Sequence, residues 1–211
     1  MIQALAKGFN DGGPFMWVIL IVFCVACAVV LERIVFYFLV CKPNGASLVS
    51  EAVKALNAEK AEDAKRAVTR RKAPMNMLLS AAVQSYSEGL SYDDIQESVD
   101  ETAIKEMPRM TQRLNYLSLF ANIGTLLGLL GTIVGLQDMF RSLAAVEAEK
   151  KAAMLAAGIS QAMNATAFGL IVAIPCMVMY TTLYNKQQHI TKDLDEAVVR
   201  FLNYLKKKKA A

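Results

Sequence analysis

Histidine, tryptophan and proline are scarce in this sequence, which has one, one and five of them in 211 residues. The single histidine, His189, and four cysteines that lie in or beside apolar segments form no group suited to metal binding or acid–base catalysis. We interpret the Cys24-x-x-Cys27 spacing as part of a membrane helix rather than a zinc or redox motif. No stretch alternates polar and apolar residues as a strand does. The sequence therefore predicts no metal site and no β-structure.

Apolar residues make up 55% of the chain and charged residues 20%, and the two kinds are segregated along it. Three segments have almost no charge, namely 15–40, 114–137 and 162–184. Each is long enough for the roughly 20 residues with which a helix crosses a bilayer. The pattern predicts an all-α polytopic membrane protein with three transmembrane helices, and it excludes an ordinary soluble enzyme.

The segment 41–113 is rich in Ala, Lys, Glu and Arg, a composition that favours helices. Its helices are predicted to break near Pro74 and at Gly89. The sequence from Ser91 to Asp94 resembles a capping box, and the helix that it begins is expected to run, bent at Pro108, directly into the second span. These helices are predicted to form a helical bundle that continues the spans.

Basic residues mark one side of the membrane. Three spans place 41–113 and 185–211 on the same side, which together with Arg33 holds 19 of the 23 Lys and Arg residues. The positive-inside rule makes that side cytoplasmic, so 1–14 and the connection 138–161 are predicted to lie on the outer side of the membrane. A net charge of +4 with this one-sided distribution indicates topology, and no nucleic-acid partner is expected.

Small and polar residues follow one face of the second span. A polar stripe and a glycine stripe lie next to each other at helical spacing. The third span carries Thr166 and Gly169 among small residues, and Pro175 removes a backbone donor from it. These residues either only pack helices together or form a narrow polar lining between spans. The two stripes consist of Ser118, Asn122, Thr125 and Thr132, and of Gly124, Gly128, Gly131 and Gly135.

Neither the second nor the third span contains an acid or a base in its apolar core. A proton relay needs a titratable group, and a dehydrated cation needs charge or several oxygen ligands. If ions pass here, another protein must supply a carboxylate. Glu32 and Arg33, near the end of the first span, can either pair with each other or reach the lipid head groups.

Two sequence stretches carry a resemblance to a known family. Residues 125–135 (TLLGLLGTIVG) and 158–175 (GISQAMNATAFGLIVAIP) resemble the paired signature of the ExbB/TolQ/MotA family of proton-channel stator subunits. Glu32-Arg33 is similar to the acid–Arg pair that ends the first span of that family. The three spans and the short length are closer to ExbB and TolQ than to MotA, which has four spans.

The resemblance implies a homopentamer in the bacterial inner membrane that encloses the single spans of two ExbD- or TolR-like partners. A partner Asp would face Thr132 and Thr166, and flow of H⁺ or Na⁺ would drive work on a TonB- or TolA-like protein, without any bound cofactor. We expect the glycine stripe to join the subunits of the oligomer. Thr125, Asn122 and Ser118 would extend the lining.

One position departs from the family pattern, because Gln161 stands where ExbB and TolQ usually carry Glu. Asp138 is then the nearest acid to the outer mouth, although a solvated helix end accounts for it equally. A non-conducting scaffold that recruits partners through its cytoplasmic helices is the alternative function, and a membrane enzyme has little support. The sequence does not distinguish among the Ton, Tol and gliding pathways, and it does not identify the ion.

Overall fold

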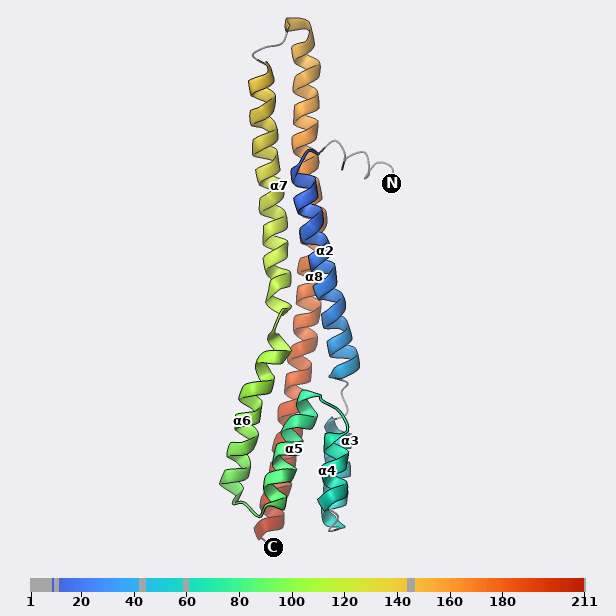
Figure 1. Ribbon diagram of the computed structural model, residues 1–211, viewed down its shortest axis with the longest axis vertical. Coiled ribbons are helices and arrows are strands. Elements are labelled where there is room, and N and C mark those ends of the chain that lie inside the picture. Colours follow the sequence, from blue (N-terminus) through green and yellow to red (C-terminus); the bar gives the residue numbers. More distant parts are fainter. Residues whose placement is uncertain (1–8, 10–11, 42–44, 59–60, 144–146, 211) are drawn as a thin grey trace. The chain divides into compact units, whose positions relative to one another are not determined.

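The structure is a computed structural model that describes residues 9, 12–41, 45–58, 61–143 and 147–210. Every secondary-structure element among these residues is a helix, which confirms the predicted fold class. The elements are α2 (Phe15–Val35), the π-helix η1 (Phe36–Val40), α3 (Gly45–Asn57), α4 (Ala61–Thr69), α5 (Pro74–Ser87), α6 (Tyr92–Thr111), α7 (Leu114–Leu143) and α8 (Ala148–Ala210) (Figure 1). Most of the predicted periplasmic N-terminus, 1–14, lies outside the described residues.

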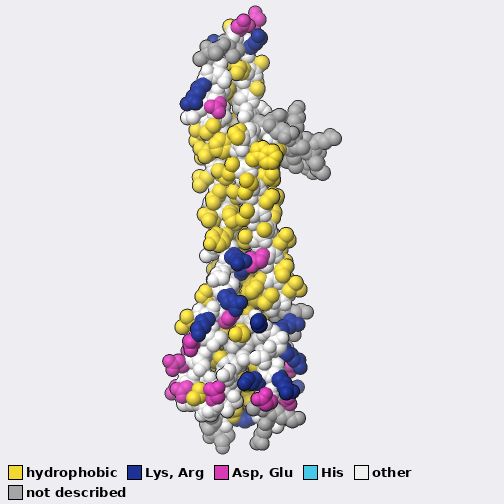
Figure 2. Space-filling model, in the orientation of Figure 1, with side chains coloured by type: hydrophobic (Ala, Val, Ile, Leu, Met, Phe, Trp, Pro, Cys, Tyr) yellow, Lys and Arg dark blue, Asp and Glu magenta, His cyan; other side chains and the backbone are white. Residues whose placement is uncertain are grey.

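The described chain has three helices long and apolar enough to cross a membrane, and they lie within Phe15–Asn57, Tyr92–Leu143 and Ala148–Lys208. Each contains one of the three predicted spans. Large apolar side chains such as Leu126, Ile133 and Met163 are exposed on these helices, as expected of surfaces that face lipid. Figure 2 shows hydrophobic side chains covering the middle of α2, α7 and α8. The protein is therefore a polytopic membrane protein.

The chain divides into two compact units. Unit 1 comprises Met1–Leu31 and Arg113–Thr182, and unit 2 comprises Glu32–Gln112 and Leu183–Ala211. Helix α8 contributes to both units, as does α2 through its last turn. The apolar core of unit 1 is built mostly from small side chains of α2, α7 and α8, which lets the three helices approach closely. This core consists of Ile19, Ala26, Ala121, Val172, Ala173 and Cys176.

Unit 2 is a bundle in which α3 packs on α4, α4 on α5 and α5 on α6. Backbone groups at its helix ends form hydrogen bonds with nearby side chains. Ser91 and Asp94 form the predicted capping box at the start of α6, and Gly89, at a φ of +79°, makes the preceding turn. The buried Asn76 amide donates to the Val68 carbonyl near the end of α4 at 2.8 Å. These contacts confirm the capping box and the two predicted breaks near Pro74 and Gly89.

One expectation about the helices is wrong. Helix α6 does not continue into α7, because the helix ends at Thr111 and Arg113 adopts a left-handed conformation with a φ of 65°. The first span stays helical to Val40, and its last five residues form the π-helix η1, after which the Cys41 N–H bonds to the Phe36 carbonyl, five residues back, at 2.9 Å. Proline alone therefore did not mark the end of α6, and nothing in the apolar composition distinguished a π-helical turn from an α-helical one.

The glycine stripe of α7 packs against α8 of the same chain. A Cβ atom on Gly128 would lie 3.1 Å from the Ala165 carbonyl oxygen, and one on Gly169 would lie 2.6 Å from the Gly124 carbonyl oxygen. A Cβ atom on Gly131 would lie 2.8 Å from the Ala165 Cβ atom. The expectation that this stripe joins subunits is wrong, because its surface is already occupied within the chain.

We predict that Gly169→Ala destabilises the contact between α7 and α8, because the added methyl group meets backbone and not a movable side chain. Overpacking of this kind typically costs about 1–3 kcal/mol in the free energy of unfolding. Gly135→Ala is the matched control, because its Cβ atom would lie at an ordinary 3.7 Å from Ala162. Unfolding in detergent micelles, followed by circular dichroism, measures both; equal stability of the two variants would contradict the assignment.

Candidate functional site

Two threonine hydroxyls meet between α7 and α8 in unit 1. Thr132 lies on α7 one turn after Gly128, and Thr166 lies on α8 one turn after Ala162. Their Oγ1 atoms are hydrogen-bonded to each other, and both side chains are half-buried. The structure thus brings together the two threonines that the sequence analysis selected from different spans.

Backbone carbonyls surround this threonine pair. Thr132 Oγ1 lies 3.1 Å from the Gly128 oxygen and 3.2 Å from the Ala162 oxygen, and Thr166 Oγ1 lies 3.3 Å from the Gly128 oxygen. Each hydroxyl carries a single proton, so the two groups can donate only two hydrogen bonds among these acceptors and each other. Several donor arrangements of the pair are therefore possible without moving a heavy atom. The hydroxyls cross-link the two helices and still retain acceptor lone pairs.

The rest of the predicted polar stripe does not join the threonine pair. Thr125 Oγ1 donates back to the Ala121 carbonyl of its own helix at 3.1 Å. The Asn122 side chain is exposed on α7, and Ser118 is half-buried. An exposed amide on a helix that crosses lipid is costly unless it finds a partner or water. This makes Asn122 a candidate contact for another protein chain.

The three pore-mouth or gating candidates have different surroundings. A Cβ atom on Gly13 would lie 2.7 Å from Gln161 Nε2, so the Gln161 amide packs over the turn before α2, where Gly13 has a φ of +78°. Asp138 is exposed, with its Oδ1 atom 3.9 Å from Arg141 Nη1. Helix α8 passes through Pro175 without interruption, and this residue is exposed.

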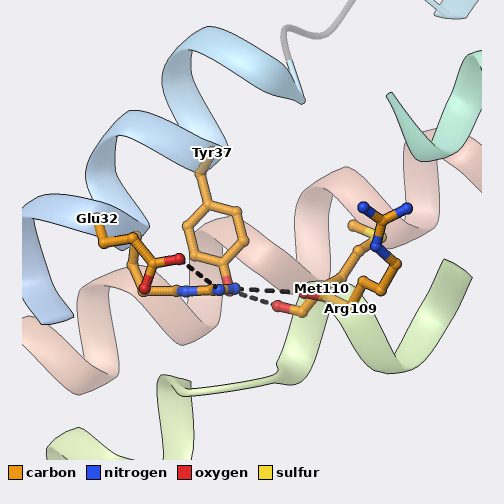
Figure 3. Close-up of polar contacts among 5 residues, drawn as sticks. Glu32, Tyr37, Arg109 and Met110 are labelled. Carbon is orange, nitrogen blue, oxygen red and sulfur yellow. Dashed lines mark hydrogen bonds and ion pairs between the residues drawn. The ribbon is translucent and has the colours of Figure 1, made fainter. Parts of the chain in front are cut away.

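Glu32 and Arg33 pair with each other, and a dashed line from the Glu32 carboxylate marks this contact (Figure 3). Arg33 Nη2 lies 3.1 Å from Glu32 Oε1, and the arginine residue is only 4% exposed. Arg33 Nη1 donates to the Arg109 carbonyl at 3.3 Å, and the guanidinium lies over the Phe36 ring at 4.9 Å from its centroid. Of the two alternatives, the pairing of Glu32 with Arg33 is therefore confirmed, and the buried Arg33 is directed to the end of α6.

The last turn of α6 receives a second donor from the first span. The Tyr37 hydroxyl donates to the Met110 carbonyl at 2.6 Å, and Tyr37 is fully buried (Figure 3). Since α6 ends at Thr111, the carbonyls of Arg109 and Met110 lack partners within their own helix. Arg33 and Tyr37 supply those partners from another segment and so act as a side-chain cap.

The sequence pattern did not indicate four residues at this cap, namely Tyr37, Glu106, Arg109 and Met110. Glu106 is buried, and both of its oxygens lie 2.9 Å from Arg109 Nη1. One signal was present, because Arg33 and Tyr37 are four residues apart and so share a helix face. The partner of that face depends on tertiary packing, which the pattern alone does not reveal.

The pKa shifts resolved outside the spans lie in unit 2, away from the threonine pair. The Lys105 ammonium, hydrogen-bonded to Glu101, lowers the pKa of that carboxyl, and burial raises the pKa of Asp195. Within the described chain, no group of three His, Cys, Asp or Glu side chains could hold a metal ion. The threonine pair alone can orient water or accept a hydrogen bond, but it cannot relay a proton by titration.

Loss of the Tyr37 hydroxyl should weaken unit 2. We expect Tyr37→Phe to lower the free energy of unfolding by about 1–3 kcal/mol, because it leaves the buried Met110 carbonyl without a donor. Tyr116→Phe, at an exposed tyrosine, is the control and should change stability little. Urea titration of the purified protein in micelles measures both values. An unchanged Tyr37→Phe midpoint would mean that water replaces the donor.

Comparison with known proteins places these features in a family. The chain matches the MotA/TolQ/ExbB proton channel family over residues 70–196. It is 28% identical over 217 aligned positions to the biopolymer transport protein ExbB of Neisseria meningitidis, covering 92% of this chain and 96% of the relative. It is 25% identical over 190 residues to a biopolymer transport protein ExbB homolog of Methanothermobacter thermautotrophicus, covering 90% of this chain.

A further relative is the Tol-Pal system protein TolQ of Haemophilus influenzae, 30% identical over 101 residues, or 48% of this chain. The chain spans 64% of the length of the Methanothermobacter relative and 44% of the length of this TolQ. The family match covers more than half of the chain and includes α5 to α7 and both threonines. The chain therefore belongs to the MotA/TolQ/ExbB proton channel family.

Proposed function

We propose that this protein is an ion-conducting stator subunit of an inner-membrane motor, of the ExbB–ExbD or TolQ–TolR type. The observation that carries the proposal is the threonine pair, in which two hydroxyls from different spans meet among carbonyls at the contact of α7 and α8. Such a group suits a path for H⁺ or Na⁺ that takes its charged group from a partner. Membership of a proton channel family supports the same function.

The partner that fits is a single-span protein of the ExbD or TolR kind, two copies of which would carry an Asp into a pentamer of this chain. A carboxylate beside Thr132 or Thr166 would accept a hydrogen bond from a hydroxyl that otherwise donates to the Gly128 or Ala162 carbonyl. Asn122 and Thr125, exposed on α7, would extend the lining, and Gln161 would replace the usual acid near the outer end. A TonB- or TolA-like protein would receive the work.

One observation favours a second candidate function, a non-conducting scaffold. The hydroxyls of the threonine pair already satisfy acceptors within the chain, so packing alone could account for both threonines. Such a scaffold would recruit partners through unit 2 and would not need an intramembrane carboxylate. The experiment on the threonines described below separates the two functions.

The proposal includes an N-out, C-in topology in the bacterial inner membrane, because basic residues gather on one side. In a variant without native cysteines, a cysteine replacing Ser142 should react with an impermeant maleimide from outside intact cells, and one replacing Ser47 should not. Both serines are exposed, so the labelling of each cysteine reports its location. Labelling only at position 47 would show the opposite topology and contradict the proposal.

The threonine pair provides the direct test of conduction. Thr132→Val and Thr166→Val keep the shape of the side chain but remove the hydroxyl. Loss of an interhelical hydrogen bond costs only about 0.6–1.7 kcal/mol in a membrane protein, so the complex should still assemble. A hydrogen bond to a charged group contributes about 1.5–3 kcal/mol, which predicts ion-driven activity that is roughly 10- to 100-fold lower.

Thr132→Ser and Thr166→Ser are the matched variants, because serine keeps the hydroxyl and should retain part of the activity. Ion uptake into vesicles that contain the protein and its partner measures conduction, and native mass spectrometry measures assembly. Normal conduction by both assembled valine variants would reject the channel proposal in favour of the scaffold.

A further inference from the structure

Unit 2 contains a pocket of about 280 Å³ just beyond the end of the first span. It lies among the end of η1, helix α3, the connection between α4 and α5, and the unit 2 part of α8. Neither the threonine pair nor the Arg33–Tyr37 cap contributes to it. The pocket therefore belongs to no site discussed so far.

The lining of the pocket is largely apolar and continues an apolar surface of the first span. Leu48, Met75 and Leu194 line the pocket, as does Val40, the last residue of η1. Phe38 and Leu39, which precede Val40, are 56% and 67% exposed. Exposed apolar side chains at the end of a membrane-spanning segment are covered by lipid tails. A lipid that lies along η1 can therefore extend one end into the pocket.

Charges of both signs also line the pocket. Arg70 and Arg71 come from the connection between α4 and α5, Glu51 from α3 and Asp193 from α8. Arg70 Nη1 lies 4.0 Å from Glu51 Oε2, whereas no ion pair engages Arg71 or Asp193 within the described chain. Arg71 offers donors that suit a phosphate, and Asp193 offers acceptors that suit an ammonium group. The formal charges of the four residues cancel.

We propose that this pocket binds the head group of a zwitterionic phospholipid with a primary ammonium, that is, a phosphatidylethanolamine. The phosphate lies at Arg71, the ammonium lies at Asp193, and the first carbons of one acyl chain contact Leu48 and Met75. The rest of the lipid lies along the exposed side of η1. The pocket is slightly smaller than the about 300–1,000 Å³ typical of small-molecule sites, so it takes a head group and not a whole lipid.

The balance of charge distinguishes this ligand from the other membrane lipids. A site for an anionic lipid is expected to present mostly cations, and here two carboxylates accompany the two guanidinium groups. A phosphatidylcholine carries the same formal charges, but its trimethylammonium group has no N–H to donate to Asp193. The phosphate and the primary ammonium of phosphatidylethanolamine match the Arg71 guanidinium and the Asp193 carboxylate, respectively.

The test uses photoactivatable lipids and the full-length protein in nanodiscs. Phosphatidylethanolamine, phosphatidylglycerol and phosphatidylcholine, each with a diazirine in the acyl chain, are irradiated separately, and adducts are mapped by mass spectrometry. Adducts at Leu48 and Met75 report the pocket, and adducts at Leu129, which is 53% exposed on α7, report general contact with lipid. We expect the ratio of pocket adducts to Leu129 adducts to be highest for phosphatidylethanolamine.

Neutral variants of similar size test the two charged groups. Arg71→Gln and Asp193→Asn should each lower the phosphatidylethanolamine ratio roughly fivefold, as expected from about 1 kcal/mol per charged contact near the membrane surface. Lys54→Gln, which removes an exposed charge of α3 outside the pocket, should leave the ratio unchanged. All three residues are exposed, so the variants should fold, and circular dichroism verifies that they do.

Two outcomes overturn the proposal. Equal ratios for the three lipids would show that the pocket takes acyl chains without reading the head group. A highest ratio for phosphatidylglycerol, lowered by Arg71→Gln but not by Asp193→Asn, would show an anionic lipid site instead.

Discussion

The close contact between α7 and α8 is the constraint on which the candidate site depends. Lipid tails are as apolar as the helices, so two spans associate through tight packing and hydrogen bonds and not through the hydrophobic effect. The contact is so close that a single methyl group on Gly128 or Gly169 would meet backbone of the other helix. At this separation, the hydroxyl of Thr132 reaches the Ala162 carbonyl of α8. The glycines thus determine which polar groups the threonines can contact.

This geometry also sets the energetics of the proposed ion path. The threonine pair has two protons and more acceptors than protons, so its donor arrangement can change without a change in packing. A hydrogen bond to a neutral carbonyl contributes about 0.5–1.5 kcal/mol, and one to a charged group about 1.5–3 kcal/mol. A hydroxyl would therefore prefer a partner carboxylate to a carbonyl, but the difference in free energy is small. The hydroxyl could return to the carbonyl when the carboxylate takes up an ion. A reversible exchange of this kind suits a cyclic motor better than a strong fixed bond.

The sequence was sufficient for the features that depend on periodicity and composition. Three spans, the capping box at Ser91 and the selection of Thr132 and Thr166 all follow from residue spacing, a local turn motif or the family signature. It was insufficient where a residue's partner lies far away in the chain. The glycine stripe has the same pattern whether it meets a second copy or the chain's own α8, and only the folded structure distinguishes them. The buried Arg33 and the split between α6 and α7 were missed for the same reason.

The end of α6 shows how a break in a long helix can be stabilised. Gln112 leaves the helical conformation with a ψ of 141°, and Arg113 follows in a left-handed conformation, so the Arg109 and Met110 carbonyls have no partner further along the same helix. A non-glycine residue in this conformation costs about 1–3 kcal/mol and persists only where the surroundings compensate for it. Arg33 and Tyr37, on one face of the first span, donate to two consecutive carbonyls of that turn. The end of α6 is therefore held by two side chains of the first span.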